Sequence, residues 1–145
     1  MKKYILLVCI CFYFSCNQKE TNKEHSNEKE EFDMYEFSQM AGLMEQFYAE
    51  NKRVKERIEN GESLGTFPAY FETIHEAELT DPKDRDAFFN EQAKIFIEAQ
   101  QLIYENNENN ENVKDHFNLA IDACIQCHQQ KCLGPIPKIK KLYIK

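Results

Sequence analysis

Near its C-terminus the chain carries the run Cys124-Ile125-Gln126-Cys127-His128. Residues three apart on a helix lie one turn apart on the same side, so both thiols can bond to the two vinyl groups along one edge of a haem. His128, four residues after Cys124, can then direct one imidazole nitrogen at the iron while the other donates to a backbone carbonyl or water. The motif predicts one covalent haem c per chain, with His128 as an axial ligand of the iron.

Two other interpretations use the same cysteines. Cys124, Cys127, His128 and Cys132 are four residues of the types that bind structural zinc, although zinc sites usually draw pairs of ligands from separate segments to fold a small core. A thioredoxin-like redox motif opens a helix beside a parallel sheet, and no strand pattern is present here. We therefore prefer covalent haem, with a structural zinc module as the less favoured alternative.

The N-terminus has the layout of an export signal. Two lysines are followed by an apolar run from Tyr4 to Phe14, and Ser15 then precedes Cys16. The run is too short for a permanent membrane anchor, so we expect residues 1–15 to be a signal peptide. The layout resembles that of bacterial lipoproteins, which implies acylation of Cys16 and a lipid-anchored protein on the periplasmic side of the inner or outer membrane. Ordinary secretion with an unlipidated Cys16 is the alternative, because Tyr13 and Phe14 stand where lipoprotein signals usually have Leu and a small residue. Residues 16–32 are almost wholly polar and predict a flexible linker.

Charge and cysteine number argue against two classes of protein. Loss of residues 1–15 leaves 16 basic and 25 acidic residues, a formal charge of −9. Such an acidic protein is a poor partner for nucleic acid. Only Cys124, Cys127 and Cys132 then remain beside Cys16, which is too few and too clustered for a disulfide framework.

Hydrophobic periodicity predicts an all-α domain over residues 33–134, folded as an antiparallel four-helix bundle. The first helix is expected from Asp33 as N-cap to Asn60, with Gly61 just beyond its end. A second is expected over 66–79 and a third from Asp81-Pro82 to Glu105. The fourth holds the haem motif and should stop by Gly134-Pro135, because Pro137 prevents continuation. Residues 135–145 form a basic tail whose apolar side chains we expect to cover the bundle; docking to an acidic redox partner or to lipid headgroups is the alternative.

Four helices with a haem motif in the last one resemble the cytochrome c′ and class II cytochrome c family over residues 33–133. The resemblance implies a monohaem protein that forms homodimers in many of its members. It also implies an aromatic and then a basic residue after the motif, whereas this chain has Gln129-Gln130-Lys131. Lys131 is the residue that could replace the missing basic partner of a haem propionate.

The function depends on which group, if any, binds the iron on the side of the haem opposite His128. In an antiparallel bundle the start of the first helix lies beside the end of the fourth, so Met40 and Met44 are candidate second axial ligands, with Met44 preferred because it lies deeper in the helix. A thioether opposite His128 raises the reduction potential and fits a carrier of single electrons between redox protein partners of the envelope. Five-coordinate iron under an apolar lid of Phe37, Met40, Met44 and Phe47 fits binding of NO or CO instead. His75 and His116 are weaker ligand candidates, and nothing in the sequence indicates an enzyme.

Overall fold

The computed structural model describes residues 36–105 and 112–145. The expected signal peptide, Cys16, the linker over 16–32 and the Asp33 cap lie outside these residues.

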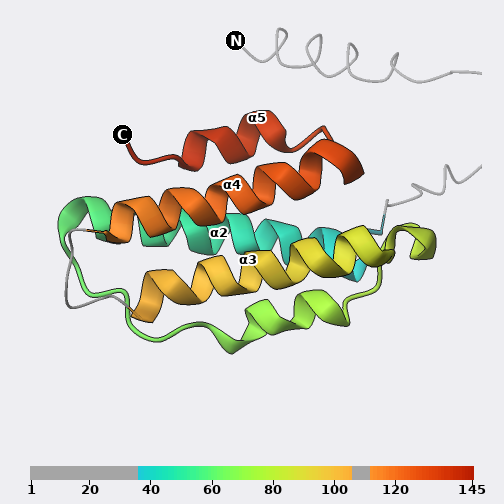
Figure 1. Ribbon diagram of the computed structural model, residues 1–145, viewed down its shortest axis with the longest axis horizontal. Coiled ribbons are helices and arrows are strands. Elements are labelled where there is room, and N and C mark those ends of the chain that lie inside the picture. Colours follow the sequence, from blue (N-terminus) through green and yellow to red (C-terminus); the bar gives the residue numbers. More distant parts are fainter. Residues whose placement is uncertain (1–35, 106–111) are drawn as a thin grey trace, which may run out of the picture. The chain divides into compact units, whose positions relative to one another are not determined.

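The described chain is helical and contains no strand, which confirms the all-α class. Three long α-helices dominate it: α2 (Gln39–Asn60), α3 (Ala87–Glu105) and α4 (Val113–Lys131). Two 3₁₀ helices, η2 (Ala69–His75) and η3 (Pro82–Asp84), connect α2 to α3. After α4 come the short α5 (Ile136–Ile139) and η4 (Lys140–Leu142). Figure 1 shows α2 and α3 running in one direction and α4 in the other. No described helix is long and apolar enough to cross a bilayer.

The ends of α2 follow local capping chemistry. Ser38 has extended backbone angles and its Oγ accepts a hydrogen bond from Ala41 N at 3.1 Å, so the helix begins later than the Asp33 cap predicts. Gly61 ends the helix as expected: its φ of 69° is left-handed, and its N–H is directed at the carbonyls of Arg57 and Ile58. Glycine adopts this conformation without the steric cost that a Cβ would bring.

The second predicted helix is shorter and tighter than the expected α-helix over 66–79. It is the seven-residue 3₁₀ helix η2, and its buried residues are Phe71 and Ile74. With three residues per turn, positions three apart lie directly above each other. A 3₁₀ helix therefore directs both side chains into the core.

The third predicted helix is interrupted. Asp81 caps it as expected, since Lys83 N donates to its Oδ1 at 2.9 Å, but only η3 follows. Asp86 then supplies a second cap by accepting from Phe89 N at 2.8 Å, and α3 begins there. The prediction that one helix runs from Pro82 to Glu105 is wrong, because a second capping side chain, that of Asp86, starts a new helix.

The prediction that Pro137 prevents further helix is also wrong. The chain leaves α4 at Lys131, before Gly134, and forms α5 with Pro137 in its first turn. Proline is tolerated there because first-turn amides have no intrahelical acceptor.

Residues 135–145, here called the C-terminal segment, pack against the helices. Ile139, Leu142 and Ile144 are 8%, 4% and 6% exposed and belong to the same buried cluster as Phe117 and Ile121 of α4. The expectation that the apolar side chains of the tail pack against the helical domain is confirmed. Its lysines at 140, 141 and 145 stay exposed, as expected for an amphipathic segment.

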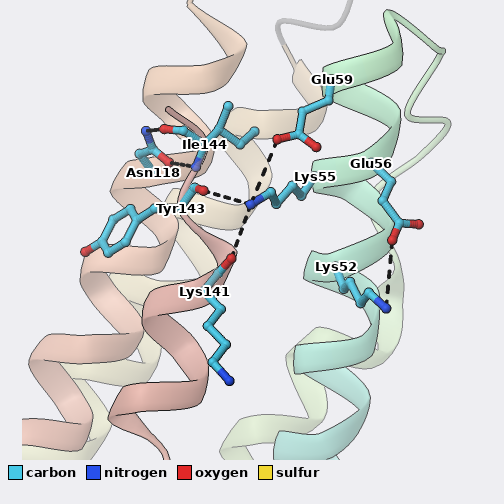
Figure 2. A network of polar contacts seen from close by, with 8 residues as sticks. All are labelled: Lys52, Lys55, Glu56, Glu59, Asn118, Lys141, Tyr143 and Ile144. Carbon is cyan, nitrogen blue, oxygen red and sulfur yellow. Dashed lines mark hydrogen bonds and ion pairs between the residues drawn. The ribbon is translucent and has the colours of Figure 1, made fainter.

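Two polar side chains of the long helices bond to the backbone of this segment (Figure 2). Lys55 Nζ on α2 donates to the carbonyls of Lys141 at 3.2 Å and Tyr143 at 2.8 Å. Asn118 on α4 donates to the carbonyl of Ile144 and accepts from its N–H, both at 2.9 Å. The segment is thus tied to both helices through its own backbone.

Candidate haem site

The motif occupies the last turns of α4. Cys124, Cys127 and His128 are all half-buried and all line one cavity between α4, α2, α3 and the C-terminal segment. Cys124 packs against both buried clusters of the molecule. The helix therefore does what the spacing predicts, directing both thiols and the imidazole into the same space.

The ring of His128 is fixed by the chain beyond it. His128 Nδ1 lies 2.9 Å from the carbonyl oxygen of Cys132, whose N–H donates back to the carbonyl of His128 at 3.0 Å. A carbonyl can only accept, so this contact requires the tautomer with the proton on Nδ1. The lone pair of Nε2 is then free for a metal, which is the arrangement expected of an axial histidine.

The cavity has a volume of about 100 Å³ and a mainly apolar wall. Phe47 of α2 and Phe96 of α3 form part of it, with ring centroids 5.1 Å apart, and Phe89 adds a third aromatic side chain. A porphyrin is larger than this space, so a bound haem requires the wall to move outward. Ile139 and Leu142 of the C-terminal segment form one side of that wall.

Met44 and Met40 are placed differently. Met44 is half-buried and lines the cavity together with His128, whereas Met40 is 6% exposed, lies in the core and does not contribute to the cavity wall. Phe37 is 69% exposed, so the expected lid of four residues is not formed. Of the four residues, Phe47 and Met44 line the cavity.

The two motif thiols are weak acids. Burial raises the pKa of Cys124 to about 12, and burial also raises the pKa of Cys127 despite the opposing charge of Lys131. Redox-active cysteines depend on a lowered pKa and a ready thiolate. The environment of these thiols is therefore opposite to that of a thioredoxin-like site.

Lys131 does not face the cavity. Its Nζ lies 2.6 Å from Asp86 Oδ2 and 3.6 Å from Asp84 Oδ1, so it joins the end of α4 to the start of α3. The expectation that Lys131 replaces a basic partner of a propionate does not fit this pairing. Lys138 of the C-terminal segment lines the cavity instead, 2.6 Å from Glu45 Oε2 and above the ring of Tyr48.

The remaining candidates lie elsewhere. His75 is exposed on η2, and neither it nor His116 lines the cavity. Cys132 is exposed as well. Over residues 36–105 and 112–145, no three His, Cys, Asp or Glu side chains are grouped closely enough to hold a metal ion, so the four residues of the zinc alternative do not form a zinc site in this geometry.

Sequence reasoning missed part of the cavity wall. Gln92 of α3 and Asn51 of α2 line it, as do Ile139 and Leu142 of the C-terminal segment. The step of three between Ile139 and Leu142 is a helical signal that indicated a buried face. It could not indicate which of the other helices that face covers.

Comparisons with protein-family models, with curated proteins and with solved structures find no match to the chain.

Proposed function

We propose that the chain is an exported monohaem c-type cytochrome that carries single electrons at the cell envelope. The observation that carries the proposal is the convergence of Cys124, Cys127, His128 and Met44 on one apolar cavity. A half-buried pair of cysteines can bind several kinds of metal ion or cofactor. Few cofactors use two thioether bonds, an imidazole ligand and an apolar cavity together. Haem c uses all three.

Each residue has a role in this proposal. Cys124 and Cys127 hold the cofactor through thioether bonds, and His128, oriented by the Cys132 carbonyl, presents Nε2 to the iron. Met44, which lines the cavity whereas Met40 does not, would hold the iron as its second protein ligand. A bound haem would supply a one-electron couple, and the mainly apolar wall that includes Phe47 would favour the less charged state of the iron.

The arrangement of α2, η2, α3 and α4 is proposed to be a divergent version of the four-helix bundle of class II cytochromes. Support comes from the three long helices, the antiparallel pair α3 and α4, and the position of the motif at the end of the last long helix. The C-terminal segment is an addition to that plan. Pairing of two bundles as a homodimer is part of the same resemblance.

Export and anchoring complete the proposal. An acylated Cys16 at the end of the signal, followed by the polar linker over 16–32, would confine the domain to the membrane surface. Redox proteins of the envelope are then the partners that such a carrier meets. This part rests on the sequence pattern alone.

The decisive experiment expresses the full chain together with the c-type maturation machinery of a bacterial envelope. We expect a haem band that survives denaturing electrophoresis. The band should be lost when Cys124→Ala and Cys127→Ala are combined, and it should persist in the matched control Cys132→Ala, because Cys132 is exposed and lies outside the cavity. A colourless protein with one zinc per chain contradicts the proposal.

Binding of NO or CO by five-coordinate iron is the second candidate, favoured by the mainly apolar lining of the cavity. Absorption spectra distinguish it from electron transfer. A low-spin ferrous form that ignores CO supports the carrier with Met44 bound, whereas a high-spin form that shifts at once on addition of CO supports gas binding.

A further inference from the structure

The last part of the chain differs in charge from the rest of the domain. Residues 123–145 include five lysines and no acidic residue, whereas residues 36–105 include 15 acidic and 7 basic residues. Positive charge is therefore concentrated in one part of an otherwise acidic domain. Such an asymmetry orients a molecule when it meets another charged surface.

Two of the five lysines are paired within the domain. Lys131 lies against two aspartates just before α3, and Lys138 lies against Glu45 of α2. The remaining three are exposed, and no carboxylate of the described residues forms an ion pair with them. They are Lys140, Lys141 and Lys145, here called the outer lysines. Their charges can pair with an anionic surface outside the described domain.

The C-terminal segment separates its apolar and basic side chains. Ile139 and Leu142 are buried and line the cavity, whereas the outer lysines are exposed. Figure 2 shows this division at Lys141, whose carbonyl accepts from Lys55 while its side chain points away from that contact. Packing against the helices thus leaves the basic face uncovered. Covering the domain and docking to a charged surface are therefore compatible uses of the segment.

Two features favour a lipid surface over an acidic protein as the docking partner. Leu133 is 67% exposed, and its carbonyl accepts from Ile136 N at the start of α5, so an exposed apolar side chain accompanies the basic segment. Basic residues with an apolar neighbour suit the boundary between anionic headgroups and acyl chains. An anchor at Cys16 also keeps the domain near lipid, which gives a weak electrostatic attraction a high effective concentration.

We propose that the outer lysines dock the domain onto an anionic lipid surface, such as a bilayer that contains phosphatidylglycerol, with the acidic body facing away. This inference rests on the lipid anchor in the proposed function. Because the same segment forms one wall of the cavity, docking places the candidate haem site on the membrane side of the domain. Redox partners that lie in or on the membrane are then the ones the site faces.

The test measures how fast each lysine of the full, processed chain reacts with a water-soluble acylating reagent, by mass spectrometry. The chain is reconstituted into vesicles of phosphatidylcholine alone or of an equal mixture with phosphatidylglycerol. Each lysine near an anionic surface strengthens binding by about fivefold, so three contribute on the order of a hundredfold. Allowing for the entropy of orienting a tethered domain, we expect the outer lysines to react at least about fivefold more slowly in the anionic vesicles. This protection should disappear at about 1 M salt, where the Debye length is about 3 Å.

Matched variants separate this surface from net charge. Lys140→Gln combined with Lys141→Gln removes two outer lysines. Lys52→Gln combined with Lys94→Gln removes the same charge from exposed ion pairs on α2 and α3. All four side chains are exposed, so the fold should persist in both variants. We expect Lys145 to lose its protection in the first variant and to keep it in the second.

Equal reaction rates of the outer lysines in the two kinds of vesicle overturn the inference, whether the face is only solvated or meets an acidic protein instead. Equal loss of protection in the two variants overturns it as well, because the effect is then one of net charge. A chain that washes off both kinds of vesicle lacks the acyl group, and the proposed anchor fails. Sedimentation of that unanchored chain with the anionic vesicles at low salt then decides the docking, and a chain that stays in solution overturns it.

Discussion

Replacing Lys55 with Met tests how the C-terminal segment is held over the cavity. The side chain of Lys55 is 22% exposed, and its ammonium donates to the carbonyls of Lys141 and Tyr143 (Figure 2). Methionine keeps the aliphatic stem and removes both hydrogen bonds. The segment should loosen without a change in the core beneath it.

The expected magnitude follows from these two bonds. A buried hydrogen bond from a charged donor is worth about 1.5–3 kcal/mol, but partial exposure and about 2 kcal/mol of lost lysine rotamer entropy reduce the sum. We expect Lys55→Met to lower the free energy of unfolding by about 2 kcal/mol. For a domain of this size that corresponds to a fall in Tm of about 8 °C.

Lys52, one turn earlier on α2, provides the matched control. It makes an exposed ion pair with Glu56 at 3.9 Å, and both side chains are more than half exposed. Such pairs contribute about 0.3–0.5 kcal/mol. Lys52→Met should therefore leave stability almost unchanged.

Two measurements check the prediction. Urea denaturation followed by circular dichroism gives the free energy of unfolding, and amide hydrogen exchange shows which residues open. In Lys55→Met we expect faster exchange at Leu142 and Ile144 and no change at Phe117. If Lys55→Met and Lys52→Met destabilise the protein equally, or if exchange in the segment is unaltered, the reasoning about this clasp is refuted.

Three further predictions concern the site and its supports. Met44→Ala should convert a low-spin visible spectrum of the holoprotein to a high-spin one if the thioether ligates, whereas Met40→Ala should leave the spectrum unchanged and lower stability. Gly61→Ala should lower the free energy of unfolding by about 1 kcal/mol in urea titrations, because φ is 69° there and no atom within 4 Å would meet the added Cβ. Hydrogen bonds from Lys131 and Phe89 N lower the pKa of Asp86 below 3.8, so its stabilising effect is present above that pH and is lost as pH falls through the lowered value. Asp86→Asn should flatten this part of the stability profile in acid titrations followed by circular dichroism.

The sequence by itself determined the features that depend only on residues close together in the chain, namely helix faces and helix caps. The placement of Cys124, Cys127 and His128 on one face of a helix follows from a spacing of three and four residues. Gly61 and Asp81 act as the caps that their types indicate, because capping involves only the next few amides. The all-α class follows from hydrophobic periodicity, which is also a pattern among residues a few positions apart.

The second capping residue at Asp86 shows the limit of local reasoning. Asp86 and Asp81 are equally good caps by type, and the Lys131 ion pair at 2.6 Å holds Asp86 at the start of α3. That contact spans 45 residues of sequence. Spacing along one helix contains no information about it.

Only the tertiary structure decided which residues share the cavity. Met40 and Met44 are four residues apart on nearly the same face of α2, so periodicity cannot separate them. The packing of α4 against α2 places the cavity beside Met44 and buries Met40 in the core. In the same way, Gln92 and the C-terminal segment reach the cavity through contacts between elements far apart in the sequence. Such contacts depend on how helices rotate and shift against one another, and the spacing of residues within one helix does not determine them.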